Sequence, residues 1–192
     1  MDYTTKLTLA AALAAGVLAL AGCGSDGTAQ NPAPAAGGGE VTVGESVPQV
    51  YADARYHYAI DAPGRMTANP DGTASFVGPS ERLEIAVVTG SSASDPGALA
   101  SQDAKALSVS ASGFRQLSSP SAMTLNGHSL IKFTYTWNAG TSAVTGKAVE
   151  LTTARYYFSK NSATVAVITY GIVSNQYDPQ GADDLASTFR WQ

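Results

Sequence analysis

The chain has one cysteine, Cys23, and this single residue constrains how the chain can fold. No disulfide can form within the chain, so any folded domain must be stabilised by its hydrophobic core alone. Cys23 follows an apolar run, residues 7–21, built almost entirely from Leu, Ala, Thr, Gly and Val. That run is shorter than the roughly 20 apolar residues that a membrane-spanning helix needs. It fits the apolar region of a secretory signal, about 7–15 residues long, and therefore predicts export.

The end of this run resembles the lipobox of bacterial lipoproteins, in which an aliphatic residue and two small residues precede a cysteine. Here the four residues are Leu20, Ala21, Gly22 and Cys23. The resemblance implies that residues 1–22 are a lipoprotein signal peptide, recognised by the signal peptidase through Leu20, Ala21 and Gly22. It also implies that Cys23 becomes a diacylglyceryl cysteine. The alternative is an ordinary signal peptide whose cysteine stands at the cleavage boundary by chance.

Lipidation at Cys23 would anchor the protein through its acyl chains, of which palmitate is the typical kind, to the cell membrane or the outer membrane, on the extracytoplasmic side. Residues 23–40 are rich in Gly, Ala, Pro, Asn, Ser and Thr and show no apolar periodicity. Such a segment cannot bury enough surface to offset its ordering entropy, so we expect a flexible linker. Residues 41–192 are then one domain, long enough to bury most of its unfolded surface.

Alternating apolar positions in the first half of this domain predict half-buried strands. We expect strands at residues 47–52, 55–61, 73–77 and 82–89. A turn is favoured by the run Asn69-Pro70-Asp71-Gly72, so residues 73–77 are expected to return as a hairpin against residues 55–61. Asp95 and Pro96 then predict the start of a helix, with Asp as the N-cap and Pro at the first helical position. The helical spacing continues to a stop at Gly113.

The second half predicts a meander of longer strands. Asn126-Gly127 is a strong hairpin signal and joins residues 122–125 to residues 128–137. Further strands are expected at residues 147–158 and 163–172, and the last is apolar on both faces, which predicts a central strand. Asp178-Pro179 begins a final helix that extends to Phe189. The predicted fold is therefore α+β, an antiparallel, meander-rich sheet covered by two helices.

This order of elements resembles the fold of the PsbP extrinsic protein of photosystem II and of the LpqN-type lipoproteins of mycobacteria. The resemblance is carried by residues 56–63, 83–88, 126–137 and 187–189. The chain departs from the pattern at Met66, where many members carry a tryptophan shortly after the position of Pro63. The resemblance implies a PsbP-like domain in a family that is mostly non-catalytic, with no shared active site to transfer.

Catalytic and metal-binding candidates are few. The two histidines, His57 and His128, both fall on polar faces of expected strands. Zinc needs three or four Cys, His or carboxylate ligands, and the sulfur of Cys23 is used for lipid, so we expect no metal and no cofactor. The chain has no G-x-S-x-G nucleophile elbow. A serine triad assembled in space stays open as an alternative, which would make the protein a cell-envelope hydrolase or transferase.

The formal net charge is -4, which gives no basic face for a nucleic acid. Tyr135, Trp137 and Tyr156 lie on strands that should be neighbours, where they would line a shallow binding groove. The interpretation that we favour is that these rings fill the core, because Tyr and Trp are common in strands. The function predicted from the sequence is a membrane-tethered, non-catalytic binding or docking module for an envelope protein or polymer.

Overall fold

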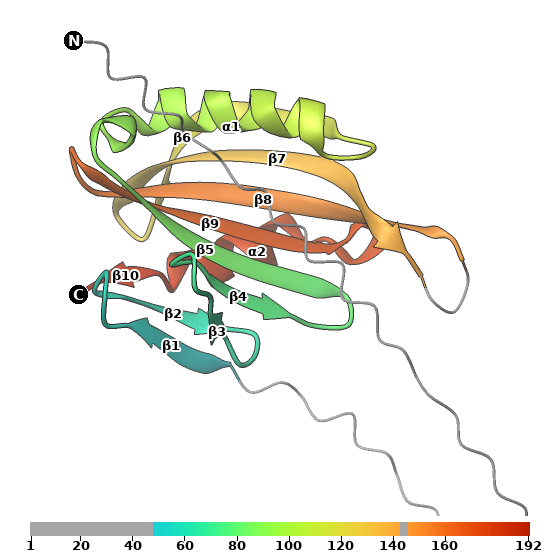
Figure 1. Ribbon diagram of the computed structural model, residues 1–192, viewed down its shortest axis with the longest axis horizontal. Helices are drawn as coiled ribbons and strands as arrows, with labels where there is room; N and C mark the ends of the chain where they lie inside the picture. The colour runs from blue at the N-terminus through green and yellow to red at the C-terminus, as the bar shows by residue number, and fades with distance from the viewer. Residues whose placement is uncertain (1–47, 143–145) are drawn as a thin grey trace, which may run out of the picture. The chain divides into compact units, whose positions relative to one another are not determined.

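The computed structural model describes residues 48–142 and 146–192, in which two β-sheets are combined with two α-helices (Figure 1). The larger sheet has seven strands in the order β3-β4-β5-β9-β8-β7-β6, and the smaller sheet has the order β1-β2-β10. Every neighbouring pair is antiparallel. These features confirm the α+β class and the antiparallel sheet with two helices.

Every expected strand is present, and β3 is an additional strand. The first expected hairpin is wrong, because β4 pairs with β3 and β5, whereas β2 pairs with β1 and β10 in the other sheet. The smaller sheet contains β1 (Gln49–Asp53), β2 (Tyr58–Ala62) and β10 (Arg190–Trp191). The larger sheet contains β3 (Thr67–Ala68), β4 (Ala74–Val77), β5 (Glu81–Thr89), β6 (Arg115–Leu125), β7 (His128–Thr141), β8 (Ala148–Asn161) and β9 (Thr164–Val173). Two short 3-10 helices, η1 (Ser91–Ala93) and η2 (Ser174–Gln176), follow β5 and β9. The hairpin at Asn126 and Gly127 is confirmed, because both residues have positive φ, 47° and 80°.

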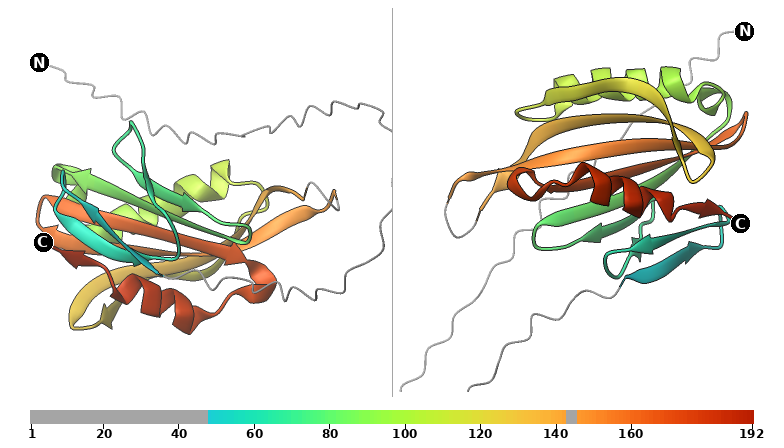
Figure 2. Two further views of the ribbon diagram at one scale, coloured as in Figure 1. Left: turned by 90° about the horizontal axis from the view of Figure 1, so that it is seen from below. Right: turned by 180° about the vertical axis from the view of Figure 1, so that it is seen from behind.

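Both helices begin where the sequence predicts. In α1 (Pro96–Ser110), the side chain of Asp95 accepts a hydrogen bond from the Ala98 amide at 2.9 Å. In α2 (Pro179–Ser187), Asp178 accepts from two backbone amides of the first turn. The helices lie on opposite faces of the larger sheet (Figure 2). Each Asp-Pro pair therefore supplies an N-cap and a preset first φ angle, as helix starts require.

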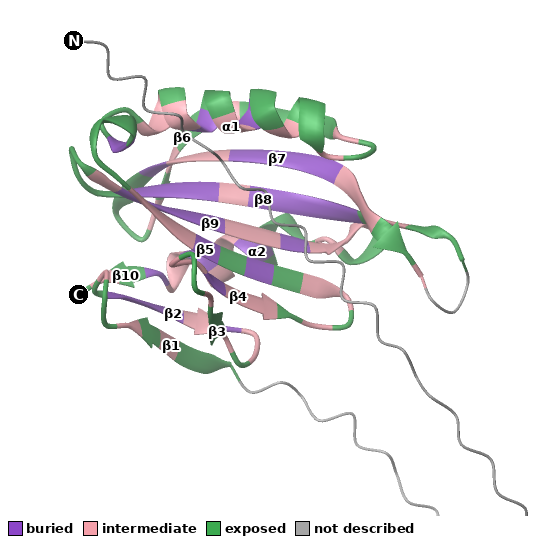
Figure 3. Ribbon diagram, viewed as in Figure 1, coloured by how far each residue is buried: buried purple, intermediate pink, exposed green. Residues whose placement is uncertain are grey.

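A hydrophobic core lies on each face of the larger sheet. The α1 face buries Phe133, Tyr135, Tyr157, Val165 and Val167 against Ala100 and Ala104 of the helix. The α2 face, with the small sheet, buries Tyr58, Ile60, Leu83, Ile85, Tyr156, Phe158, Ile168, Ala182, Ala186 and Phe189. Alternation of buried and exposed residues is plain along β5 (Figure 3). The domain is thus a layered structure with the sheet between its two cores.

Several element boundaries differ from the prediction: β2 begins at Tyr58 rather than at residue 55, and β7 continues to Thr141 rather than ending at residue 137. The largest differences are at β6 and at the last helix. Strand β6 begins at Arg115 rather than at residue 122, and most of its residues are exposed. It is an edge strand, bonded to β7 alone, so it needs no apolar alternation, and Pro120 is tolerated there. The last helix ends at Ser187, and Arg190–Trp191 instead pairs with β2. Phe189, which continues the helical pattern in the sequence, lies between α2 and β10 and packs in the α2-side core.

A candidate binding surface beside helix α1

Helix α1 covers only part of its face of the larger sheet. It lies over β6, β7 and β8, and its small residues Ala100 and Ala104 pack in the core with Phe133 and Tyr157. Farther along the same face, the first part of β5 and the second half of β9 have no helix of the described residues above them, whereas Val88 near the end of β5 packs in the α1-side core (Figure 1). The prediction that residues 163–172 are covered on both faces therefore holds for Val165 and Val167, whereas Thr169 is only half-buried.

Cross-strand register places several polar residues on this uncovered area. Arg82 of β5 is opposite Gly171 of β9, which is opposite Thr153 of β8, which is opposite Tyr135 of β7. Directly paired residues of antiparallel strands point to the same face, and Tyr135 belongs to the α1-side core. Arg82 therefore projects from the α1 face. Val77 of β4 pairs with Arg82 and is 68% exposed on that face.

An ion-pair network marks the boundary between the covered and the uncovered area. Arg155 Nη1 lies 3.2 Å from Asp103 Oδ2, and Arg155 Nε donates to Thr169 Oγ1 at 3.0 Å. The Tyr157 hydroxyl donates to the same Asp103 oxygen at 2.7 Å. Burial raises the pKa of Tyr157 and Asp103 raises it further, although Arg155 opposes this shift. The phenol is thus a proton donor to a carboxylate at neutral pH, a role that holds α1 on the sheet.

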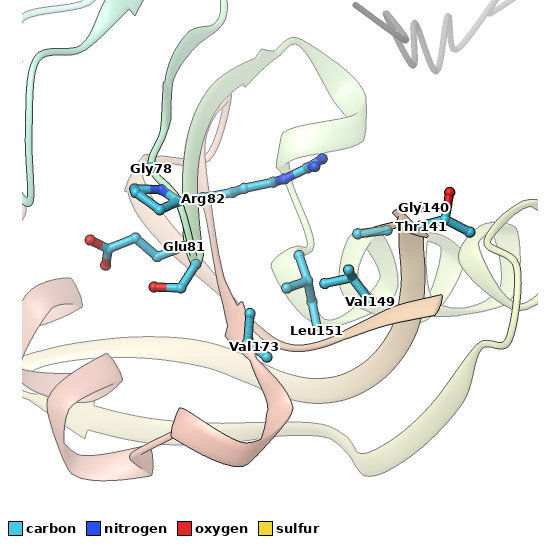
Figure 4. A pocket seen from close by; sticks show the side chains of 11 residues that line it. Gly78, Glu81, Arg82, Gly140, Thr141, Val149, Leu151 and Val173 are labelled. Atoms are coloured by element: carbon cyan, nitrogen blue, oxygen red, sulfur yellow. The ribbon is translucent and has the colours of Figure 1, made fainter. Parts of the chain in front are cut away.

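A shallow pocket of about 160 Å³ opens at the far end of the uncovered area (Figure 4). Its apolar wall consists of Val149, Leu151 and Val173. Leu151 pairs with both Val173 and Trp137, so the pocket shares its face with α1. The remaining lining residues come from the β4–β5 turn, the start of β5 and the end of β7: Gly78, Pro79, Ser80, Glu81, Arg82, Ala139, Gly140 and Thr141.

The charged residues of the pocket point in different directions. Figure 4 shows the Arg82 side chain extending across the pocket from β5, while the Glu81 side chain points away from it. The carboxylate of Glu81 accepts a hydrogen bond from the Tyr170 hydroxyl at 2.8 Å, on the α2 face. Within residues 48–142 and 146–192, no carboxylate forms an ion pair with Arg82. The pocket therefore combines the apolar wall formed by Val149, Leu151 and Val173 with one exposed cation, Arg82.

Gly171, which lies between Arg82 of β5 and Thr153 of β8, places no side chain on this part of the sheet surface. A Cβ atom at Gly171 would lie 2.8 Å from Thr153 Oγ1, which is too close for an undisturbed contact. That same oxygen accepts a hydrogen bond from Trp137 Nε1 at 3.1 Å. Because Gly171 has no side chain, the hydrogen-bonded pair Trp137 and Thr153 fits on the sheet surface beside the pocket. No Gly171 side chain then stands between Arg82 and this pair.

The rings of Tyr135 and Tyr156 fill the core, which is the interpretation favoured from the sequence, and they do not form the alternative, an aromatic binding groove. Tyr135 is 3% exposed and Tyr156 is fully buried, so neither ring can meet a partner. They also lie on opposite faces, because Tyr135 packs in the α1-side core and Tyr156 in the α2-side core. Tyr156 donates to Asp183 of α2 at 2.7 Å. Trp137 is half-buried and adjoins the pocket through Leu151.

The histidines lie away from this surface. His57 follows β1, and His128 begins β7 beyond the turn at Asn126; both are exposed. No hydrogen bond joins either imidazole to a serine in the described parts of the chain. Among the same residues, no group of three or more His, Cys, Asp or Glu side chains is placed to hold a metal ion.

The residues predicted to carry the lipid anchor, Leu20, Ala21, Gly22 and Cys23, lie outside the described residues, as does the linker at residues 23–40. The signal peptide and the lipidation site therefore stay predictions. Within the described part of the chain, no helix combines the length and the apolar character that a bilayer crossing requires.

Sequence reasoning missed the pocket. Arg82 and Val149 fall in expected strands without a functional role, and Val173 lies just beyond the strand expected at residues 163–172, so each stands alone in its own segment. Only the strand order β5-β9-β8 brings these three segments together. One signal was present in the sequence. Arg82 and Glu84 place charges on the polar face of a strand whose other face is apolar.

Comparison with known proteins identifies a similar fold. No family model matches the chain, and no curated protein matches its sequence. The Ran-binding protein Mog1p of Saccharomyces cerevisiae is 11% identical with a TM-score of 0.52, over 75% of this chain and 95% of that chain. A protein of Bacteroides thetaiotaomicron is 9% identical with a TM-score of 0.51, over 76% of this chain and 49% of that chain, so this chain spans about half of that protein.

A third similar structure is LpqN of Mycobacterium tuberculosis, described as involved in cell envelope biogenesis. It is 16% identical over 73% of this chain and 79% of that chain, with a TM-score of 0.39, which is too low to carry an argument. The similarity to Mog1p shows a common fold. At these identities the comparison concerns architecture alone.

Proposed function

We propose that this protein is a lipid-anchored, extracytoplasmic lipoprotein whose PsbP-like domain is a non-catalytic module that binds an envelope protein or polymer. One observation carries the binding role: the uncovered part of the α1 face, where exposed Val77 and Arg82 flank a pocket with an apolar wall. Protein interfaces are enriched in arginine and concentrate binding energy in pockets filled by an anchoring side chain. Arg82, which pairs with no carboxylate of the described residues, and the adjoining pocket give this surface both features.

The anchor is supported by the sequence of residues 20–23 and by the polar linker that follows. An acyl chain on Cys23 would hold the domain near a membrane, and the linker would let its binding surface reach a partner. Mog1p, which has a similar fold, is a Ran-binding protein. A fold hosts many functions, so that likeness supports only the suitability of the scaffold for binding.

The non-catalytic role is supported by the composition of the pocket. Ser80 and Thr141 contribute hydroxyls to its lining, but no histidine or cysteine lines it. A serine or threonine nucleophile needs a base within hydrogen-bond reach. Arg82 cannot act as that base, because a guanidinium stays protonated at neutral pH. The carboxylate of Glu81 points away from the pocket (Figure 4) and accepts a hydrogen bond from the Tyr170 hydroxyl instead.

Photo-crosslinking in living cells tests the proposed function. A benzoylphenylalanine at position 77, on the proposed surface, is compared with one at position 109 on α1, since Val77 and Val109 are both exposed valines. The expected result is a recurrent crosslinked species of the lipidated full chain from position 77 and none from position 109. Equal crosslinking from both positions, or none from position 77, would overturn the assignment of the surface.

A further inference from the structure

We propose that the pocket beside Arg82 receives one aliphatic side chain of a partner protein, and that Arg82 binds a carboxylate next to it in the partner's sequence. The inference rests on the proposed function and specifies the partner chemistry of the same surface. The ligand is thus an acidic segment in which Leu, Ile or Val adjoins Asp or Glu.

The size of the pocket selects the kind of occupant. Sites for cofactors and drug-sized ligands have volumes of roughly 300–1,000 Å³, whereas this pocket holds about 160 Å³. It is too small for a whole small molecule and suits a single anchoring side chain. Protein interfaces concentrate binding energy in such anchors, surrounded by contacts that exclude water.

The pocket walls select an aliphatic anchor. Val149, Leu151 and Val173 come from two neighbouring strands and form one apolar wall (Figure 4). Leu151 is buried, while Val149 and Val173 are half-exposed. Covering the two valines with a partner's side chain would remove apolar surface from water, which is favourable at about 25 cal/mol per Å².

The charges around the pocket select an acidic neighbour. Glu81 is hydrogen-bonded to Tyr170 and points away, so Arg82 is the charged group that the pocket presents. Glu84 is two residues along β5 on the same face as Arg82, on the side of Thr169 and Arg155. Its negative charge repels an anion from that side. A carboxylate therefore approaches Arg82 from the pocket, where a guanidinium can bind both of its oxygens.

Val77 extends this surface beyond Arg82. It pairs directly with Arg82 and is 68% exposed. Across the strands, exposed Val77 is followed by the cation Arg82 and then by Gly171, and Arg82 also lines the pocket. A peptide lying across this area would place one aliphatic group in the pocket, its acid on Arg82 and a further apolar group on Val77.

Methyl NMR of the full chain in detergent micelles tests the inference. The probe is an acetylated hexapeptide, Gly-Ser-Leu-Glu-Ser-Gly-amide, compared with versions that have Gln for Glu or Ala for Leu. The expected result is a saturable shift of the methyl signals of Val149, Leu151 and Val173 with the Leu-Glu peptide. Both altered peptides should bind more weakly, because each lacks one of the two recognised groups.

Two arginine variants test whether the peptide's carboxylate binds at Arg82. Arg82→Gln should weaken binding of the Leu-Glu peptide roughly tenfold, in line with the loss of a hydrogen bond to a charged group. Arg115→Gln removes the same charge from an exposed position on the other face of the sheet, because Arg115 pairs with Thr136. It should leave the affinity unchanged. A thermal melt of each variant shows that the domain remains folded.

Three outcomes would overturn the inference: no methyl shift at millimolar peptide, equal binding of the Gln peptide, or equal affinity in the Arg82→Gln chain. Binding of a uronic-acid oligosaccharide at these methyl groups without peptide binding would overturn it as well, in favour of a polymer. In each case crosslinking from position 77 would remain as the separate test of the proposed function.

Discussion

Asp103 of α1 and Arg155 of β8 form an ion pair between the helix and the sheet, with 3.2 Å between Oδ2 and Nη1. Tyr157 donates to the same carboxylate oxygen, and Arg155 also donates to Thr169 of β9. These contacts hold α1 over β8, next to the half-buried Thr169 at the border of the open surface. The pair therefore lies at the boundary between the covered and the open surface.

Asp103→Ala should lower the free energy of unfolding by roughly 2–3 kcal/mol, because it leaves a largely buried guanidinium and the Tyr157 hydroxyl without their acceptor. Urea denaturation of the full chain measures the change. Asp184→Ala removes an exposed carboxylate from α2 and should stay within about 0.5 kcal/mol of the parent. A loss for Asp103→Ala no larger than for this control would contradict the role of the ion pair.

Stability should decrease in alkaline solution. Burial raises the pKa of Tyr156 and Tyr157, and their hydrogen bonds to Asp183 and Asp103 raise it further, while Arg155 opposes the shift of Tyr157. A raised folded pKa favours the neutral phenol in the native state. The stabilisation is then fully present below about pH 10, the ordinary tyrosine value, and is lost as the pH rises from there towards the folded pKa.

Urea midpoints measured from about pH 8 to pH 11 should stay level and then fall, and Tyr156→Phe should make the fall shallower. Absorbance of ionised tyrosine gives an independent readout in the folded protein. Full ionisation of all tyrosines near pH 10 with an intact near-ultraviolet spectrum would show that these phenols are not protected by the fold.

Phe189 closes the α2-side core from the C-terminal segment. Its ring centroid lies 4.9 Å from that of Phe158, 5.1 Å from that of Trp191 and 5.5 Å from that of Tyr58. Phe189→Ala should reduce the free energy of unfolding by about 3–5 kcal/mol, as expected for a fully buried aromatic ring. Val109→Ala, at an 86% exposed position, is the control for chemical denaturation. Similar midpoints for the two variants would refute this packing.

The C-terminal segment, residues 178–191, shows which helix boundaries can be predicted from the sequence and which cannot. Helix starts were predicted because capping is local: Asp95-Pro96 and Asp178-Pro179 supply their own hydrogen bonds and φ angles. The end of the last helix was wrong because Phe189 satisfies a helical period while it packs between α2 and β10. Periodicity reports which residues are buried, and burial alone does not distinguish these conformations.

The pocket could not be predicted for a different reason. Its lining residues are separated by long stretches of chain, and Arg82 meets Val173 and Leu151 only through the pairing of β5, β9 and β8. The alternative of an aromatic groove fails on the same point, whereas the favoured interpretation of Tyr135 and Tyr156 as core residues agrees with their burial. The sequence correctly indicates that Tyr135 and Tyr156 lie on strands, but the register sends them to opposite faces. Register is a property of the assembled sheet.

Gly171→Ala should both destabilise the domain and disturb the open surface. The new Cβ would lie 2.8 Å from Thr153 Oγ1, so the hydroxyl must shift, which disturbs the hydrogen bond that it accepts from Trp137. We expect a loss of roughly 1–3 kcal/mol from overpacking, together with a change in Trp137 fluorescence. Gly97→Ala, in the half-buried first turn of α1, where a Cβ would lie 3.3 Å from Asp95 Oδ1 and meet no other atom, is the comparison. Unchanged fluorescence in Gly171→Ala would contradict the proposed contact.

Cys23→Ser tests the anchor on which the tethered function depends. Without its sulfur, residue 23 cannot accept a diacylglyceryl group, so the chain should carry no lipid and should either retain residues 1–22 or be released from the membrane. Metabolic labelling with an alkyne palmitate analogue, followed by membrane fractionation and intact-mass measurement, distinguishes these states. Ser25→Ala, close by in the linker, should leave lipidation unchanged. If the Cys23→Ser chain is processed to its mature length and still fractionates with membranes, the attachment must come from the folded domain, and residues 20–23 lose their proposed role.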